Sequence, residues 1–214
     1  MINVLLVDDH ELVRTGIRKI LDEVKGIKVI GEAATGEEAI KFCRKTEPDV
    51  ILMDMQMPGM GGLEATKKLL RYAPDIKIIV LTVYTEATIP TKVMQIGASG
   101  YLTKSTCPNE MVIAIRAVNS GQRYISLDIA QQMALNQSKS PDENPFNLLS
   151  ERELQIMLMI TRGEKVPDIS ERLMLSSKTI NSYRYRMFEK LNVSNDVELT
   201  HLAIRHGMLQ TEKL

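Results

Sequence analysis

The sequence predicts an α/β domain, a doubly wound sheet of five parallel strands, followed by a small all-α domain of four helices. Two observations predict the sheet: apolar runs recur along the first half of the chain, and amphipathic segments separate them. Buried parallel strands joined by helical crossovers have this pattern. The strands are expected near 3–8, 27–31, 49–54, 76–82 and 99–103. The helices are expected near 11–23, 36–46, 62–71, 87–96 and 109–119.

The chain divides into three parts. The first domain covers residues 1–122, where Gly121 is a plausible stop for the fifth helix. Residues 123–146 are predicted to be a linker with one short helix, because residues 136–145 are polar and include two prolines. The second domain covers residues 147–214 and shows helical periodicity without any strand pattern.

Helix-start signals define the second domain. Ser150 and Glu153 form a capping box for a helix that runs to about Arg162. The second helix is expected at about 167–174. The third is expected at 177–191 with Ser176 as its cap, and the fourth is expected to begin after a cap at Asp196 and to end near Gly207. The brief Leu175–Ser176 turn between the second and third helices predicts a helix-turn-helix.

The composition is that of a globular protein, with 44% hydrophobic and 25% charged residues in 214. No apolar run is long enough to span a membrane, and the start lacks the features of a signal peptide. Cys43 and Cys107 match no metal-binding spacing and are interpreted as buried or half-buried thiols. A cytoplasmic location and no membrane partner are therefore expected.

Five polar residues follow or end the apolar runs of the first domain: Asp8, Asp9, Asp54, Thr82 and Lys104. In a parallel sheet the carboxyl ends of the strands meet at one edge, where ligands bind. Three acids, a hydroxyl and an ammonium group at that edge form a site for Mg²⁺ and a phosphoryl group. Asp54 is the candidate nucleophile, because a carboxylate can form an aspartyl phosphate.

Each of these residues alone is common at a strand end, where it caps a helix or forms a turn. Their occurrence at successive strand ends, in order, favours the phosphoryl site. His10 lies beside the acidic pair and is interpreted as a loop or helix-start residue near the pocket rather than a metal ligand.

Four segments resemble the receiver domain of bacterial two-component response regulators, a flavodoxin-like fold. They are Val7–His10, Leu52–Gly62, Leu81–Thr82 and Gly100–Lys104. The resemblance covers residues 1–120. It implies that a sensor histidine kinase phosphorylates Asp54, that Lys104 balances the new charge, and that Thr82 and Tyr101 form a conformational switch. It also implies Mg²⁺ ligation by Asp8, Asp9, Asp54 and the Gln56 backbone carbonyl.

Two positions depart from the receiver pattern. Ser105 stands where many receivers have proline, which excludes a cis-proline there. Val83 stands where a small alanine is more usual, and we expect it to slow access of phosphate to Asp54. Neither departure removes a chemical group from the site.

Residues 147–210 resemble the DNA-binding domain of the NarL/FixJ (LuxR-type) family, on the segments Leu149–Glu153 and Leu175–Leu191. The helical period places Ile180, Met187 and Leu191 on a core-facing side of the third helix. The opposite side carries groups suited to the major groove of DNA. The candidates for reading bases are Asn181, Ser182 and Tyr185, and those for contacting phosphates are Lys178, Thr179, Arg184 and Arg186.

Over the whole chain the resemblance is strongest to the GacA/UvrY/SirA/LetA subgroup, on segments 64–66, 121–126 and 183–186. It implies a promoter-binding homodimer that switches on genes for small RNAs of a CsrA/RsmA-type pathway, with RNA polymerase as a further candidate partner. The protein is not expected to be an enzyme, apart from phosphoryl transfer to Asp54 and hydrolysis from it.

Two other readings of the residues remain open. A phosphohydrolase acting through an aspartyl phosphate needs a second acid two residues after its nucleophile, where this chain has Gln56. It also leaves the second domain unexplained. An interaction protein that uses the first domain as a docking switch does not account for the basic cluster within 177–191.

Overall fold

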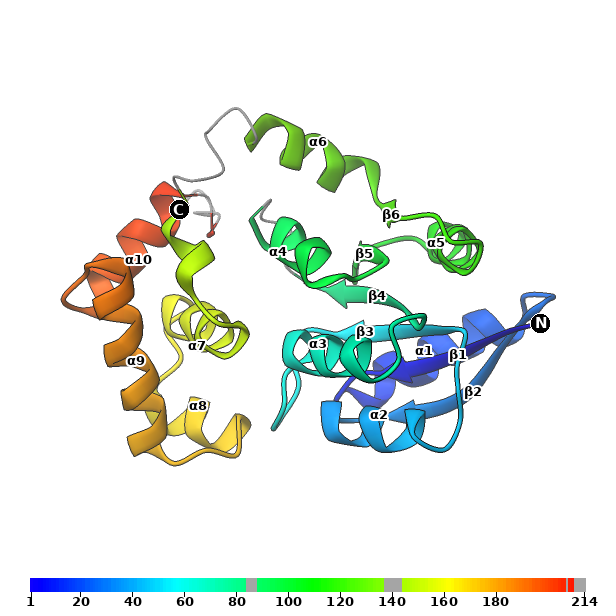
Figure 1. Ribbon diagram of the computed structural model, residues 1–214, viewed down its shortest axis with the longest axis horizontal. Helices are drawn as coiled ribbons and strands as arrows, with labels where there is room; N and C mark the ends of the chain where they lie inside the picture. Colours follow the sequence, from blue (N-terminus) through cyan, green and yellow to red (C-terminus); the bar gives the residue numbers. More distant parts are fainter. Residues whose placement is uncertain (84–87, 137–143, 207, 210–214) are drawn as a thin grey trace. The chain divides into compact units, whose positions relative to one another are not determined.

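The computed structural model describes residues 1–83, 88–136, 144–206 and 208–209. The chain forms two compact units, one built around the parallel sheet and one containing the last four helices (Figure 1). Each unit is described by itself. Within the described ranges, no helix combines the length and apolar character needed to cross a membrane.

The sheet has six parallel strands in the order β2-β1-β3-β4-β5-β6. Five of them match the predicted strands: β1 (Ile2–Val7), β2 (Ile27–Ala33), β3 (Val50–Asp54), β4 (Lys77–Thr82) and β5 (Gly100–Thr103). The prediction of five strands was one short. The sixth, β6 (Tyr124–Ile125), pairs with β5 and lies in the segment predicted to be linker. Two residues are too few to show strand periodicity, so only the pairing reveals it.

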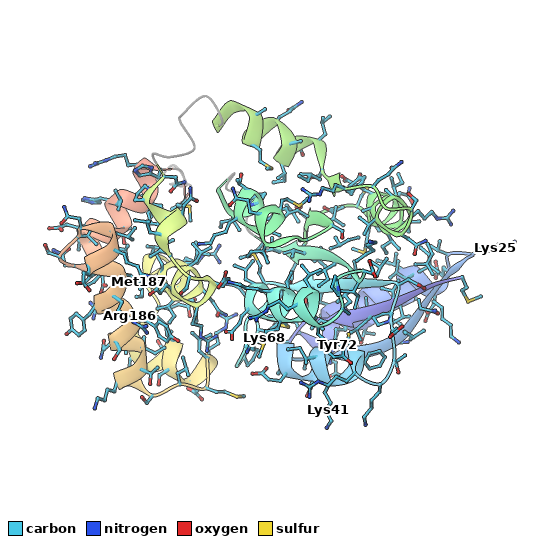
Figure 2. The ribbon with its side chains drawn as sticks, viewed as in Figure 1. Lys25, Lys41, Lys68, Tyr72, Arg186 and Met187 are labelled. Carbon is cyan, nitrogen blue, oxygen red and sulfur yellow. The ribbon has the colours of Figure 1, made fainter. Side chains whose placement is uncertain are left out.

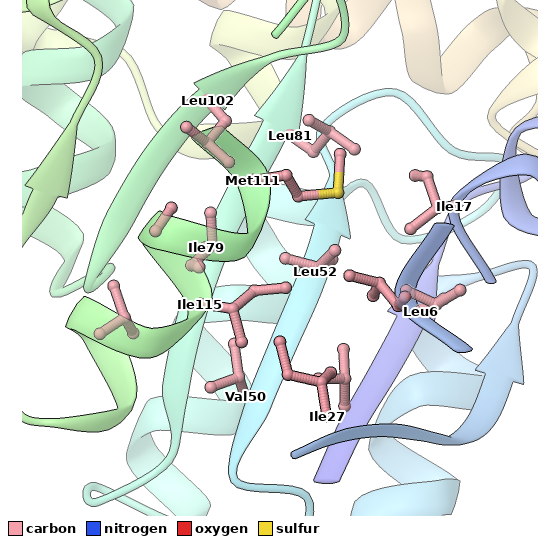
Figure 3. Packing of buried hydrophobic residues seen from close by; sticks show 14 of the residues in the cluster. Leu6, Ile17, Ile27, Val50, Leu52, Ile79, Leu81, Leu102, Met111 and Ile115 are labelled. Atoms are coloured by element: carbon pink, nitrogen blue, oxygen red, sulfur yellow. The ribbon is translucent and has the colours of Figure 1, made fainter. Parts of the chain in front are cut away.

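Alternate residues of the strands supply two separate hydrophobic cores, one on each face of the sheet. Val4 and Leu6 pack with α1 (Glu11–Asp22) and α5 (Pro108–Asn119), as Figure 3 shows for part of this cluster. Leu5 and Val7 pack on the other face, where α2 (Gly36–Cys43) and α3 (Gly62–Tyr72) contribute the helical residues. The remaining helix of this series is α4 (Thr88–Ile96). Burial on both faces explains why these strands read as continuous apolar runs.

Two short elements precede the helical unit's four main helices. They are α6 (Leu127–Asn136), which confirms the predicted short helix, and a 3-10 turn at Pro145–Leu148. The polar segment predicted between them lies largely outside the described residues. The main helices are α7 (Glu151–Thr161), α8 (Val166–Arg172), α9 (Ser177–Leu191) and α10 (Asp196–Arg205).

Local capping signals set the helix starts of this unit. The predicted capping box is present: Ser150 accepts a hydrogen bond from the Glu153 backbone, and the Glu153 carboxylate accepts one from the Ser150 backbone. Ser176 caps α9 as predicted. The predicted cap at Asp196 was wrong by one residue, because the Asn195 side chain accepts the hydrogen bond that caps α10. Asp196 is instead the first helical residue.

Both cysteines are free thiols. Cys43 is buried within the α2–α3 core, and burial raises the pKa of its thiol to about 11. Cys107 precedes α5 and is exposed, contrary to the expectation that it is at least half-buried. The N-cap position of Cys107 places it outside the helix face that packs on the sheet.

Candidate functional site

The carboxyl ends of three strands bring together two acids and a lysine. Asp8 follows β1, Asp54 ends β3 and Lys104 follows β5. The Lys104 Nζ atom lies 2.6 Å from Asp8 Oδ2 and 3.1 Å from Asp54 Oδ2. Asp8 and Asp54 are only 3% and 2% exposed, so the lysine ammonium compensates two carboxylates that are removed from solvent.

Gly62 allows α3 to begin directly against Asp54. A Cβ atom at Gly62 would lie 1.8 Å from the Asp54 carbonyl oxygen, so no other residue fits without moving backbone. The Gly62 backbone N–H donates to the Met55 carbonyl and closes this loop. The close approach holds the Asp54 backbone between β3 and α3.

The charges of the pocket influence one another. Burial raises the pKa of the Asp54 carboxyl to about 6, and the Asp8 carboxylate adds to this effect. Lys104 and a hydrogen bond from the Gln56 backbone oppose the rise. Burial by itself lowers the pKa of Lys104, but Asp54 and Asp8 outweigh it and raise the pKa above its usual value. The pocket therefore favours a charged lysine beside a carboxylate that is costly to ionise.

Asp9 and His10 complete a cluster of metal-binding side chains. One ligand atom from each of Asp8, Asp9, His10 and Asp54 lies within 4.8 Å of the others. Three carboxylates against one lysine leave an excess of negative charge, which a divalent cation would neutralise. The oxygen-rich donor set fits a hard ion such as Mg²⁺.

The two residues expected to form a switch lie on neighbouring strands. Thr82 ends β4 and Tyr101 is in β5, and both are fully buried. The Lys104 backbone N–H donates to the Thr82 carbonyl, which joins the two strand ends beside the pocket. Val83, one of the two departures from the receiver pattern, is 52% exposed.

In the second unit, α9 carries a core face and a polar face. Ile180, Met187 and Leu191 are buried, as predicted. Figure 2 labels the neighbours Arg186 and Met187 on α9. On the polar side, Thr179 and Asn181 are half-buried. The exposed residues of that side are Lys178, Ser182, Tyr185 and Arg186.

Two family models match the chain. The response regulator receiver domain model matches residues 4–116, and the model of the luxR family of bacterial regulatory proteins matches residues 147–203. The chain belongs to the LuxR-type response regulators. This response regulator is therefore a two-component, DNA-binding transcription regulator rather than a metabolic enzyme, and its receiver domain implies a sensor kinase as partner.

Relatives match this response regulator over its whole length. It is 67% identical to response regulator UvrY of Escherichia coli K12, covering 100% of this chain and 99% of the relative. It is 57% identical to response regulator GacA of Pseudomonas aeruginosa PAO1, covering 98% of each chain. These matches confirm the predicted subgroup.

A solved structure supports the same architecture. RcsB of Salmonella enterica serovar Typhimurium, bound to promoter P1flhDC in the presence of the phosphomimetic BeF₃⁻, matches with a TM-score of 0.66 and 28% identity. The match covers 94% of this regulator and 97% of RcsB.

Two arginines of the regulator's α9 have partners within their own unit. Arg184 Nε donates to Asp196 Oδ1 at 2.7 Å, its Nη2 contacts Asp196 Oδ2, and its guanidinium lies over the Phe188 ring. The arginine connects α9 to the start of α10, and its expected phosphate contact stays a prediction. The Arg186 guanidinium lies 4.5 Å from the centre of the Tyr183 ring.

Sequence reasoning missed the position of the His10 side chain. Its Nδ1 atom lies 2.8 Å from Asp9 Oδ1 and 3.3 Å from Asp8 Oδ1. Adjacency to the acidic pair was visible in the sequence, but the direction of the ring was not. The structure therefore includes an imidazole among the groups that could hold a metal.

Proposed function

We propose that this regulator accepts a phosphoryl group on Asp54 from a sensor histidine kinase and then binds promoter DNA as a dimer to regulate transcription. The observation that carries the proposal is the contact of Lys104 with both Asp54 and Asp8, in a chain that also has a LuxR-type DNA-binding domain. A cytoplasmic location is part of the proposal, because promoter DNA and the kinase's phosphate donor are found there.

The transfer is a displacement at phosphorus. An Asp54 carboxylate oxygen forms a bond to the phosphorus of the kinase's phosphohistidine, and the phosphorus–nitrogen bond breaks. The bonding electrons remain on the leaving ring. If its other ring nitrogen carries a proton, the ring departs as neutral imidazole; otherwise it departs as imidazolate and takes up a proton from water. Lys104 and the Thr82 hydroxyl are the groups proposed to bind the oxygens of the transferred phosphoryl group.

Asp8, Asp9, Asp54 and the Gln56 carbonyl are proposed to hold Mg²⁺. Neutralising the charge between the acids and the incoming phosphoryl group is the chemistry that a bound Mg²⁺ supplies. The clustering of Asp8, Asp9 and Asp54 oxygens supports this ligand set.

Thr82 and Tyr101 are proposed to convert the new charge into a change of the receiver surface. Thr82 ends β4 and Tyr101 lies in the adjacent strand β5, and the Thr82 carbonyl accepts a hydrogen bond from the Lys104 backbone N–H; these positions support this role. The change biases a two-state element, and the favoured state dimerises.

For DNA, Asn181, Ser182 and Tyr185 are proposed to read base edges, and the phosphate contacts are assigned to Lys178, Thr179 and Arg186. Arg184 is reassigned to positioning α10 against α9, because Asp196 occupies its guanidinium. RcsB has been solved as two dimers on two parallel DNAs, which supports dimeric binding here. The resemblance to GacA and UvrY supports target genes for small RNAs of a CsrA/RsmA-type pathway, with RNA polymerase as a partner at the promoter.

A comparison of phosphoryl labelling between the wild-type chain and the Asp54→Asn variant tests the proposal. Incubation of the wild-type chain with acetyl phosphate and Mg²⁺ should add one phosphoryl group, detected by mass spectrometry of the intact protein. Asp54→Asn should gain none, and EDTA should prevent the gain in the wild type. Asp75→Asn, which changes an exposed acid, is the matched control and should be labelled like the wild type. Undiminished labelling of Asp54→Asn would overturn the assignment.

A further inference from the structure

We propose that His10 is a metal ligand and that its imidazole makes the acidic pocket select first-row transition ions, such as Mn²⁺, over Mg²⁺. The inference rests on the metal site of the proposed function and adds to it a nitrogen ligand from outside the expected set. It concerns which ion the pocket prefers, whereas the proposed function concerns what the pocket does.

The distances around His10 match the edges of an octahedral ligand shell. Two adjacent ligands on an octahedral ion with bonds of about 2.1 Å are about 3.0 Å apart. The His10 Nδ1 atom lies 2.8 Å from Asp9 Oδ1 and 3.3 Å from Asp8 Oδ1. The imidazole nitrogen therefore lies near the octahedral edge distance from two candidate ligand oxygens at once.

The two oxygens of Asp8 face different partners. Asp8 Oδ2 contacts the Lys104 ammonium, whereas Asp8 Oδ1 faces His10 and also accepts the His10 backbone N–H at 2.9 Å. The lysine and the imidazole thus lie on separate sides of the carboxylate. A cation held on the Oδ1 side can bind the imidazole without meeting the Lys104 charge at the same oxygen.

The backbone brings the imidazole to this position. His10 is the N-cap residue of α1 with extended backbone angles, but its side chain makes no capping hydrogen bond. Its side chain is 58% exposed, and the ring Nδ1 atom contacts the carboxylates of Asp8 and Asp9. The ring therefore points at the acids instead of the helix end, and a cation that enters from solvent would replace its contacts with the two carboxylates.

Ligand chemistry explains the expected selectivity. Mg²⁺ strongly prefers oxygen ligands and gains little from an imidazole, while transition ions of the first row accept nitrogen readily. Replacing one water by the His10 nitrogen therefore strengthens binding of Mn²⁺ more than binding of Mg²⁺. The carboxylates are common to both ions, so the imidazole decides the difference.

The test compares Mn²⁺ binding by the full-length wild-type chain and by the His10→Asn variant. Both are measured at a pH of about 8, where metal ligands are deprotonated. The electron paramagnetic resonance signal of free Mn²⁺ measures its Kd, and displacement by Mg²⁺ measures the Kd of Mg²⁺. Electron spin-echo modulation reports whether a nitrogen is bound directly to Mn²⁺. His201→Asn, which changes an exposed histidine of α10, is the matched control.

We expect nitrogen modulation from the wild type and from His201→Asn, and its loss in His10→Asn. The Kd of Mn²⁺ should rise about tenfold or more in His10→Asn, as it does when groups that hold a metal are removed, while the Kd of Mg²⁺ changes little. Circular dichroism should show that both variants remain folded.

Three outcomes would count against the inference or its foundation. Bound Mn²⁺ without nitrogen modulation would show that the imidazole only donates a hydrogen bond to the acids. An equal rise in both Kd values would show that His10 positions Asp9 without selecting the ion. Failure of the wild type to bind either ion would overturn the metal site itself, and with it that part of the proposed function.

Discussion

At the scale of single residues, Asp54 combines a proposed chemical role with an energetic cost. Its carboxyl is almost completely buried, and its pKa in the folded chain is about 6, above the ordinary value of 3.8. The folded state therefore binds this proton more tightly than the unfolded state does. The stabilisation from the protonated form is complete below about pH 4 and is lost as the pH rises to about 6.

Asp54→Asn should therefore stabilise the metal-free protein at neutral pH. In EDTA, we expect the free energy of unfolding above pH 6 to rise by up to about 3 kcal/mol, because a neutral amide avoids burying a charge. The gain should disappear near pH 4. Urea unfolding followed by circular dichroism, from pH 4 to 8, measures it. Asp75→Asn should show no such gain, and equal stability of Asp54→Asn and wild type at pH 8 would contradict the argument.

The salt dependence of DNA binding should separate Lys178 from Arg184. Lys178 is exposed at the start of α9, so Lys178→Ala should reduce the slope of log affinity against log salt by about one unit. Arg184→Ala should leave the slope nearly unchanged, because Asp196 already occupies its guanidinium. Fluorescence anisotropy on a promoter duplex and a scrambled duplex measures both. If Arg184→Ala also reduced the slope of log affinity against log salt by a full unit, Arg184 would be a phosphate contact after all.

At the scale of elements, an ion pair between a buried glutamate and an exposed lysine connects α7 to α9. Glu153 is 2% exposed, and its Oε2 atom accepts a hydrogen bond from Lys190 Nζ at 2.6 Å. Burial raises the pKa of Glu153, but the hydrogen bonds from Lys190 and Ser150 outweigh this effect and lower the pKa overall. One side chain thus caps α7 and also fixes the α9 helix against it.

Glu153→Gln should weaken the DNA-binding domain at neutral pH. We expect a loss of about 1–3 kcal/mol, because the amide keeps the shape but removes the charge that Lys190 contacts. The lowered pKa means that the stabilisation is present above the unfolded-state pKa, near 4.5, and is lost as the pH falls through the lower folded-state value. Urea unfolding at pH 7 and pH 3 should show the difference between variant and wild type shrinking in acid.

Glu189→Gln provides the matched control for this pair. Glu189 is an exposed acid one position before Lys190 on the same helix, so its loss should change the unfolding free energy little. An equal effect from both variants would show that the general charge of α9, and not the Glu153–Lys190 pair, stabilises the domain.

At the scale of the whole molecule, the proposed phosphorylation site and the LuxR-type DNA-binding domain lie in different parts of one chain. A phosphoryl group on Asp54 can influence α9 only by changing the relative stability of two states of the receiver. Coupling of this kind is typically worth about 1–3 kcal/mol, or roughly 5- to 150-fold in affinity. Thr82 is the residue through which we expect the coupling to pass.

Thr82→Ala should still be phosphorylated but should lose most of the gain in dimerisation and DNA affinity. Asp54 and Lys104 remain to perform the transfer, whereas the hydroxyl that would follow the phosphoryl group is absent. Sedimentation velocity and anisotropy, each with and without acetyl phosphate, measure the gain. Asp54→Asn sets the baseline of no response. A wild-type response from Thr82→Ala would place the switch elsewhere.

Local pattern determined most of the architecture. Continuous apolar runs specified the first five strands, because both faces of a parallel sheet are buried. The same rule placed Asp8, Asp54 and Lys104 at one edge, since parallel strands all end on the same side. Capping signals such as that of Ser150 set helix starts within a residue or so, because they depend on neighbours in the chain.

Tertiary structure decided what depends on distant partners and side-chain direction. The pairing of β6 with β5 requires the edge of an assembled sheet, and two residues carry no period of their own. The Arg184 side chain contacts Asp196, the first residue of α10, and no spacing on α9 reveals this partner. The His10 ring contacts Asp8 and Asp9 from the start of α1, a direction that its place in the sequence does not reveal. The sequence by itself thus determined which groups reach the site, and the fold determined which of them touch.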